Sequence, residues 1–479
     1  MVAAFIMTAG RIVAGSPTSA DPVAAQHPHV RLAIACLLVS LAGCASVETT
    51  RAPTRTTQVA SAQFAEARTL AANHAALSGQ ARRDNGARIE ALLAQLDDAT
   101  LSRDTESLPV GDPLYNFAGR VLLNRGLPLP RAFDRGDTSF GAADRPAAER
   151  GGYRPPLKVG VLLPLSGGQS AAAAAVRDGF LAGYYGETRR RPEVQFYDTA
   201  NGASGAYARA VSAGSDLVVG PLGREQVDAM FGSDTLSVPM LALNRGSHAP
   251  PAGSAGFSLS PEDEGISLAQ LLVQRGAKQV LLVTGTDDSQ RRVTGAARSQ
   301  LERRGVRITG SLDYREDLSE ALRQAAGAGG VDAVLLSLKG SQARTVVPQL
   351  AAAGLSGALR VAGSQIVSGT GKPADDIALD GVVYPTETWG VRGVAGLPSQ
   401  ARAAARVDTA KGPAARLFAF GYDAWLLTAH LEHLATSANA EISGATGTLS
   451  LDGFGNVLRA PSWSRFSGGV GVPMADGAR

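Results

Sequence analysis

Short apolar runs alternate with segments of helical periodicity from residue 157 onward. The apolar runs predict strands at 159–165, 194–198, 217–220, 240–243, 280–284, 308–314, 333–338, 359–363 and 382–385. The segments between them predict helices at 171–185, 225–231, 266–275, 293–304, 318–326 and 344–353. Near-continuous apolar strands separated by helices are typical of a parallel sheet buried on both faces. Because so many strands exceed one ordinary sheet, the pattern predicts an α/β fold of two lobes, each with a doubly wound parallel sheet.

After the last of these strands, the pattern predicts a long helix at 416–434 and then a hairpin. The hairpin has strands at 448–451 and 456–459 around the turn Asp452-Gly-Phe-Gly455. We expect lobe one to take residues 157–256 and 386–440. Lobe two would take residues 257–385 and 441–470, including this hairpin.

Before residue 157, the pattern of hydrophobic and polar positions predicts secondary structure less clearly. Ile89, Leu92, Leu93 and Leu96 recur at helical spacing, and 63–77 predicts a second, weaker helix. We therefore expect a short helical region at 62–130. A polar run at 131–156 predicts a linker to the α/β region.

An apolar stretch of about a dozen residues, Leu32–Gly43, is half of what a bilayer-spanning helix needs. With Arg31 at its edge it predicts the core of a signal peptide at 1–43. The sequence Leu41-Ala-Gly-Cys44 resembles the lipobox of bacterial lipoproteins, which implies cleavage before Cys44 and its lipidation. Ala45 stands where an aspartate would signal inner-membrane retention, so the resemblance implies the outer membrane. The alternative is an ordinary signal peptide.

Residues 44–61 are rich in Thr, Ala and Arg with little to bury, and they predict a flexible tether. No later segment approaches transmembrane length. We therefore expect everything after Cys44 to lie in the periplasm, at the periplasmic face of the outer membrane.

Composition and charge narrow the possible chemistry. The 479 residues are 44% hydrophobic and 19% charged, which is typical of a folded chain of several compact units. The net charge of +3 is small and spread out, so we expect no nucleic-acid partner. Two cysteines provide neither a disulfide framework nor a four-ligand zinc site.

Catalytic signatures are missing from the sequence. It contains no Gly-x-Ser-x-Gly elbow and no His-Glu-x-x-His motif, and none of its five lysines completes a phosphate-binding loop. His430 and His433 lie three residues apart beside Glu432, but no third metal ligand is identifiable. We expect no enzymatic activity, no metal and no cofactor.

Polar and glycine-containing turns follow several of the predicted strands, at the edge where open α/β sheets bind ligands. They contain Ser166, Gly167, Pro221, Asn244, Arg245 and Ser247. Ser166 either holds a ligand's carboxylate or caps the following helix. Arg245 is either an anion partner or a solvated residue of a tight turn. These six residues are our candidate cleft, for a peptidoglycan fragment or a small ligand.

Several motifs carry a family resemblance. The segments 158–167 (Lys-Val-Gly-Val-Leu-Leu-Pro-Leu-Ser-Gly) and 175–180 (Ala-Val-Arg-Asp-Gly-Phe) resemble the opening of type I periplasmic binding proteins, such as the branched-chain amino-acid receptors. More specific segments, at 218–222, 238–244, 257–264, 421–425 and 444–449, resemble the carboxyl-terminal domain of the LppC lipoproteins, the penicillin-binding protein activators. The resemblance covers residues 157–470.

This resemblance implies an outer-membrane lipoprotein that stimulates a class A penicillin-binding protein and raises peptidoglycan cross-linking without catalysis. Family members typically carry a much larger helical-repeat domain at the amino end than the helical region expected here. The alternative is a solute-binding lipoprotein of an ABC importer or a sensor. The turns read Pro-Leu-Gly-Arg and Asn-Arg-Gly-Ser where amino-acid receptors carry Ser- and Thr-rich loops, which favours the activator.

A protein-binding surface is expected to carry aromatic and arginine anchors. Tyr384 lies in the last predicted strand of the series, and Trp389 and Arg392 lie in the glycine-containing segment that follows it. We predict that these three side chains are exposed and contact the partner.

Overall fold

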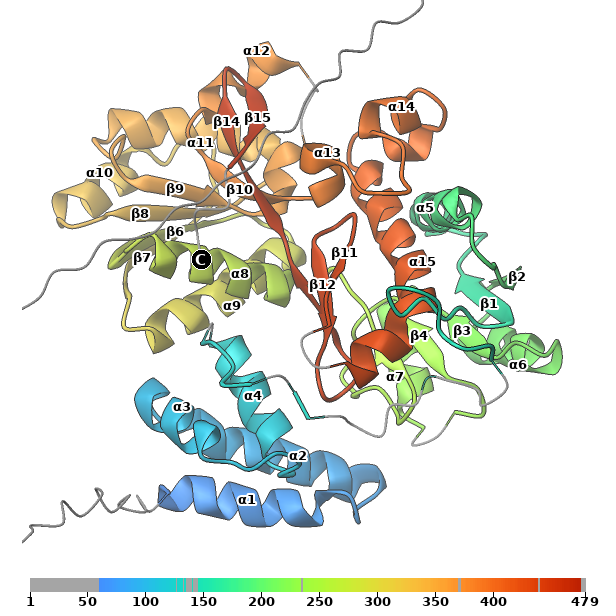
Figure 1. Ribbon diagram of the computed structural model, residues 1–479. Coiled ribbons are helices and arrows are strands. Elements are labelled where there is room, and N and C mark those ends of the chain that lie inside the picture. The colour runs from blue at the N-terminus through green and yellow to red at the C-terminus, as the bar shows by residue number, and fades with distance from the viewer. Residues whose placement is uncertain are drawn as a thin grey trace, which may run out of the picture. The chain divides into compact units, whose positions relative to one another are not determined.

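The computed structural model describes residues 60–474, apart from residues 126, 132, 135–139, 141–144, 234–235, 369–371 and 438–439 (Figure 1). The expected signal peptide, Cys44 and most of the tether lie outside the described residues. Within the described part of the chain, every helix is too short or too polar to cross a bilayer.

The first sheet is parallel throughout, in the strand order β2-β1-β3-β4-β5. This order is that of a doubly wound α/β sheet. Its elements are β1 (Lys158–Leu163), α5 (Ser170–Gly186), β2 (Glu193–Asp198), α6 (Ala203–Ser212), β3 (Leu217–Val219), α7 (Arg224–Phe231), β4 (Met240–Ala242), β5 (Ala255–Gly256) and the later helix α15 (Ala414–Thr436). We call this sheet with its helices α5, α6, α7 and α15 lobe one.

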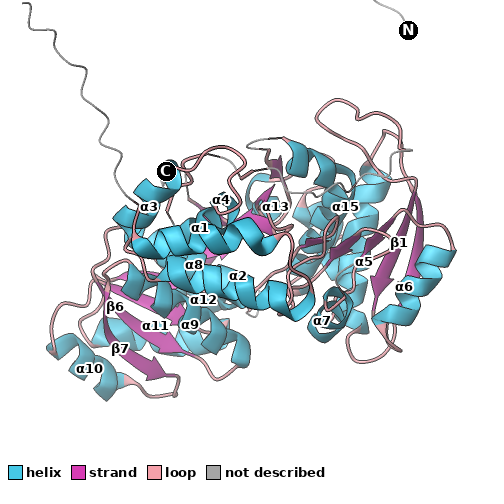
Figure 2. Ribbon diagram, turned by 90° about the horizontal axis from the view of Figure 1, so that it is seen from below, coloured by secondary structure: helices cyan, strands magenta, loops and turns pink. Residues whose placement is uncertain are grey.

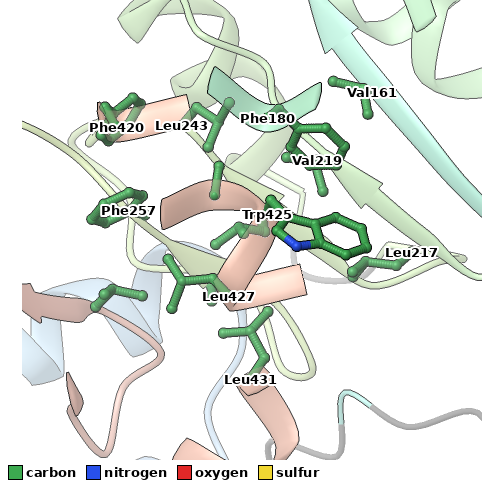
Figure 3. Packing of buried hydrophobic residues seen from close by; sticks show 14 of the residues in the cluster. Val161, Phe180, Leu217, Val219, Leu243, Phe257, Phe420, Trp425, Leu427 and Leu431 are labelled. Carbon is green, nitrogen blue, oxygen red and sulfur yellow. The ribbon is translucent and has the colours of Figure 1, made fainter. Parts of the chain in front are cut away.

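The core of lobe one lies between its sheet and the helices α5 and α15. Phe180 and Trp425 meet edge to face with ring centroids 5.6 Å apart, and Phe257 stacks on Phe420 at 4.4 Å (Figure 3). The two helices approach closely because glycines line the contact. A Cβ on Gly421 would come within 2.0 Å of the carbonyl oxygen of Val176.

The second sheet has the order β15-β14-β10-β9-β8-β6-β7, with β6 to β10 parallel and the hairpin β14–β15 antiparallel at one edge (Figure 1). Its elements are α8 (Pro261–Gln274), β6 (Gln279–Thr284), α9 (Asp288–Arg303), β7 (Arg307–Asp313), α10 (Ser319–Gly327), β8 (Ala333–Ser337), α11 (Gly340–Ala352), β9 (Leu359–Ala362), β10 (Val383–Thr386), β14 (Ser462–Ser467) and β15 (Val470–Pro473). Helices α8 and α9 bury one face of this sheet, and α10 and α11 bury the other. We call this sheet with α8–α11 lobe two. The predicted α/β fold with two parallel sheets is confirmed.

A separate antiparallel sheet is formed by β11 (Ile442–Ser443), β12 (Thr448–Leu451) and β13 (Val457–Ala460). Leu449, Leu451 and Val457 of the predicted hairpin lie in the hydrophobic core of lobe one. This position differs from our assignment of the hairpin to lobe two, because the apolar side of the hairpin is buried against α15 and the first sheet. The strands that join lobe two are β14 and β15, which the sequence pattern did not predict.

The chain passes between the lobes at three crossovers: from β5 to α8, from β10 to α13 (Thr388–Arg392), and from β13 to β14. The short elements near these passages are η1 (Ser364–Val367), α12 (Pro373–Asp376), η2 (Ile377–Leu379), α14 (Gln400–Ala404) and η3 (Asp408–Ala410). The hydroxyls of Thr388 and Ser462 lie 3.0 Å apart and join the second crossover to the third.

Among the described residues before β1 there are four helices: α1 (Ala62–His74), α2 (Gly79–Ala94), α3 (Asp98–Glu106) and α4 (Tyr115–Asn124) (Figure 2). We call them the helical segment. They share a hydrophobic core that includes Phe64, Ile89, Leu93 and Leu122. Side chains cap two of the helices, since Ser61 accepts a hydrogen bond from the amide of Phe64 and Asp97 from that of Thr100.

The described end of the predicted linker is bound to lobe one. Arg145, whose side chain is buried, pairs with Asp216 at 2.9 Å. Arg154 pairs with Glu432 at 2.6 Å, and its amide donates to the carbonyl of Ala429 on α15. The chain between the helical segment and β1 is therefore anchored just before β1.

Candidate functional site

The first predicted cleft turn is bound to its own sheet. The Ser166 hydroxyl donates to Asp198 Oδ2 at 2.5 Å, and the amide of Leu165 donates to Asp198 Oδ1 at 2.9 Å. The Ser166 hydrogen bond is the main cause that lowers the pKa of Asp198. Gly167 has φ of +79°, a conformation that favours glycine. Ser166 thus fastens the β1–α5 turn to the end of β2, and it does not cap α5.

The other predicted cleft residues also bind neighbours within the chain. The Asn244 side chain donates to the carbonyl of Leu222 at 2.8 Å, which joins the turn after β4 to the turn that holds Pro221. The Ser247 hydroxyl donates to Asp228 at 2.9 Å. Arg245 pairs with Asp263 in the first turn of α8 at 3.0 Å, with both side chains about 40% exposed. Arg245 therefore already has an anionic partner within the chain.

A partly buried ion-pair network lies where the crossovers meet, and we take it as the candidate site. Arg416, near the start of α15, reaches Glu264 of α8 at 3.1 Å and Glu387 of the second crossover at 3.3 Å. Ser364, after β9, donates to Glu264 through its amide at 2.8 Å and its hydroxyl at 2.6 Å, and Arg416 also contacts that hydroxyl. One arginine of lobe one thus holds groups from lobe two and from a crossover. We call Glu264, Ser364, Glu387 and Arg416 the crossover network.

Burial and charge set the protonation of this network. Burial alone would raise the pKa of Glu264, whose side chain is 7% exposed. The Arg416 charge and the two Ser364 hydrogen bonds outweigh burial, and the net pKa is lowered. Burial would likewise lower the pKa of Arg416, but Glu264 and Glu387 raise it. Glu264 and Arg416 are therefore both ionised at neutral pH.

A small cavity of about 60 Å³ lies beside the crossover network, at the carboxyl edge of the second sheet. It is lined by the network residues Glu264, Ser364 and Arg416 and by Leu259, Pro261, Ser289, Gln290, Val293, Ser337, Leu338, Gly363 and Gln365. Its lining includes none of the six predicted cleft residues. The Gln365 side-chain oxygen is buried without a hydrogen-bond partner. The cavity is polar but small, and its strongest charges neutralise each other.

The prediction of an exposed aromatic surface was wrong for two of its three residues. Trp389 is 2% exposed, stacks on Phe418 at 5.1 Å, and donates through its indole to the carbonyl of Pro398. Tyr384 is 5% exposed and packs against Phe466, because β14 pairs with β10 and covers it. Arg392 is exposed, at the end of α13.

The histidine pair on α15 has a packing role. His430 meets Tyr153 edge to face with centroids 5.6 Å apart, and burial lowers its pKa to about 4. Gly152 packs against the ring of His433, where a Cβ would come within 2.3 Å. Among the residues that the structure describes, no group of three or more His, Cys, Asp or Glu side chains is placed to hold a metal ion.

Sequence reasoning missed the crossover network. Glu264 lies in the acidic first turn of α8, and Arg416 and Ser364 belong to no recognisable motif. The acidic segment Pro261-Glu-Asp-Glu264 is what the start of a helix favours, so it does not single out Glu264.

Two α/β lobes, each built on a largely parallel sheet and joined by three crossovers, define a protein of the type I periplasmic-binding-protein class. A solved putative branched-chain amino acid ABC transporter protein from Chromobacterium violaceum is 26% identical, with a TM-score of 0.54 over 65% of this chain and 100% of that one. The LpoA (YraM) C-domain from Haemophilus influenzae, a regulator of PBP1A, has a TM-score of 0.58 at 22% identity, over 66% of this chain and 100% of that one.

Residues 153–306 and 319–469 match the family described as "LppC putative lipoprotein", and this chain belongs to that family. A curated relative, the penicillin-binding protein activator LpoA of Photobacterium profundum, is 26% identical over 66% of this chain and 57% of its own length. The LpoA of Klebsiella pneumoniae is 28% identical over 59% of this chain and 45% of its own length. The chain thus spans about half the length of the curated relatives that it matches.

Proposed function

We propose that this chain is an outer-membrane lipoprotein that activates a class A penicillin-binding protein and so raises peptidoglycan cross-linking. The observation that carries the proposal is the LppC match over both lobes, together with relatives named as penicillin-binding protein activators. In this proposal Cys44 carries the lipid, and the folded region faces the periplasm.

The activator acts by binding and catalyses nothing. An activator of this kind prefers one conformation of its partner and shifts the population toward it by the difference in binding free energy. The absence of catalytic motifs in the sequence supports this role. Arg392, which is exposed on α13, is the remaining candidate from the predicted partner surface.

A solute receptor is the second candidate, since the binding-protein class contains such receptors. Two observations favour the activator. The cavity of about 60 Å³ at the crossover network is far below the roughly 300 to 1,000 Å³ of usual ligand pockets, and a wider pocket of about 650 Å³ lies away from this network, against α6 and α7. Glu264 and Arg416, the charged residues that line this cavity, are paired with each other, so neither charge is left for the amino or carboxyl group of an amino acid.

Sedimentation velocity with the class A synthase of the same genome tests the proposal. We expect a complex that sediments faster than either protein, and two independent boundaries at micromolar concentrations would contradict it. A thermal-shift panel of amino acids and muropeptides tests the receptor, because a ligand at 100 times its Kd stabilises the folded state by about 2.7 kcal/mol. A concentration-dependent shift with no synthase complex would replace the activator by the receptor.

A further inference from the structure

The helical segment contacts both lobes, and the two contacts differ in kind. It meets lobe one through the tip of the β12–β13 hairpin and lobe two through the ends of α8 and α9. In the view of Figure 2, α1 and α2 cross the region between the α8–α9 pair and α7. These contacts lie outside the crossover network, so they form a separate connection between the lobes.

The contact with lobe one is aromatic and rigidly supported. Phe454, at the hairpin turn, meets Phe117 of α4 edge to face at 4.7 Å, and the Arg120 guanidinium lies 3.8 Å from its ring centroid. Asp452 holds the turn by accepting from the amides of Phe454 and Asn456 at 2.9 and 2.7 Å. The hairpin itself is held in place because Leu449, Leu451 and Val457 are buried in the core of lobe one.

The turn is also bonded directly to the first sheet. The amide of Gly256, in β5, donates to the carbonyl of Gly455 at 2.9 Å. Gly455 has φ of +83° and lies so close to the carbonyl of Ser254 that a Cβ would come within 2.6 Å of it. Phe454 is therefore a fixed extension of lobe one into the core of the helical segment.

The contact with lobe two is polar. Arg304, just after α9, pairs with Asp98 at the start of α3 at 3.0 Å, and both side chains are partly exposed. Gln270 of α8 donates to the carbonyl of Leu123 on α4 at 3.4 Å. Arg125, which is buried, holds Asp98 in place at 3.2 Å. This end is held by an ion pair and a hydrogen bond, which break at lower cost than the aromatic end.

Arg125 also makes the helical segment rigid. Its guanidinium donates to the carbonyls of Leu93, Ala94 and Leu96 at the end of α2, where helix carbonyls otherwise lack partners. One side chain thus joins α4, the end of α2 and the start of α3. Because of these bonds, a displacement of Asp98 acts on the helical segment as one unit.

We propose that the helical segment is a brace that holds the two lobes at one relative angle, with Phe454 as its fixed end and the Arg304–Asp98 pair as its releasable end. Binding proteins of two lobes move by rotation about their crossovers. A connection away from the crossovers opposes that rotation. The proposal concerns the isolated chain and does not depend on any synthase.

Double electron–electron resonance between the lobes tests the brace. Spin labels are attached in the full chain at Ser212→Cys, at the exposed end of α6, and Ala328→Cys, just after α10, with Cys36→Ser and Cys44→Ser removing the native thiols. The releasing variants are Arg304→Ala and Phe454→Ala. The matched control is Arg88→Ala, which removes an exposed ion pair with Glu66 inside the helical segment.

We expect one narrow distance distribution in the parent chain and in Arg88→Ala, and at least a twofold wider or a shifted distribution in both releasing variants. The proposal is overturned if the distance distributions of both releasing variants are unchanged, if only one of the two changes, or if the control variant broadens equally. If Phe454→Ala fails to fold, as judged by circular dichroism, Phe454→Leu keeps an apolar side chain without the aromatic partner and is judged by the same criteria.

Discussion

Replacing Arg416 with alanine is the sharpest test of the crossover network. The substitution leaves the Glu264 carboxylate buried with only the two Ser364 hydrogen bonds. Removing one partner of a buried ion pair costs about 3 to 5 kcal/mol. Because a quarter of the Arg416 side chain is exposed and Ser364 remains, we expect a loss of about 3 kcal/mol in the free energy of unfolding at pH 7.5.

The loss should depend on pH in a definite direction. The folded-state pKa of Glu264 lies below its ordinary value of 4.5, so its contribution is present above that value and is lost as pH falls through the lowered pKa. Without Arg416 the pKa of Glu264 rises, and protonation removes the uncompensated charge. Acidification from pH 7.5 toward pH 4 should therefore shrink the difference between the variant and the parent.

Urea denaturation followed by tryptophan fluorescence and circular dichroism measures this difference. The control is Arg323→Ala, since Arg323 pairs with Glu320 at 2.8 Å while both side chains are more than 60% exposed. That variant should lose less than about 0.5 kcal/mol, as exposed pairs contribute little. A loss for Arg416→Ala no larger than that of the control, or one that grows on acidification, would refute the reasoning.

Four further substitutions have expected outcomes that differential scanning calorimetry checks. Gly421→Ala should lower the free energy of unfolding by about 3 kcal/mol or more, because its Cβ would lie within 2.0 Å of the Val176 carbonyl oxygen. Gly295→Ala, on α9 with nothing within 4 Å, should raise it by up to about 1 kcal/mol. Equal effects of the two variants would contradict the close contact between α5 and α15. Trp389→Ala removes a core side chain and should lower the free energy of unfolding by about 3 to 5 kcal/mol. An unchanged melting temperature would indicate that Trp389 is exposed, as the sequence predicted. Arg245→Ala should lower the free energy of unfolding by less than about 1 kcal/mol, because the ion pair with Asp263 is exposed. A larger loss would show that this pair stabilises the fold.

The central parallel strands β1, β3, β4, β6 and β8 could be predicted because they are buried on both faces, which makes their apolar runs nearly continuous. Helix α6 was missed although its buried residues Ala203, Ala206, Tyr207 and Ala210 recur at helical spacing, because three of the four are alanines that differ little from their small neighbours. Strand β15 was missed because Val470–Pro473 is exposed along its length. In both cases the local pattern lacks the contrast on which the prediction depends.

The candidate site depended on contacts that are distant in sequence. Arg416 and Glu264 are 152 residues apart, and each has an ordinary local context. Trp389 lies in a short helix without a periodic apolar face, and its burial comes from Phe418 and from the loop that contains Pro398. The turns at Ser166 and Asn244 could be located, but their bonds to Asp198 and to the Leu222 carbonyl follow only from the fold.

The measurement that tests the central proposal most directly is the fraction of cross-linked muropeptides made by the class A synthase of the same genome, with and without this chain. Lipid II is the substrate, and the chain is added up to saturation, with heat-unfolded chain as the control. We expect the cross-linked fraction to rise with the folded chain alone. An unchanged fraction at saturating concentrations would contradict it.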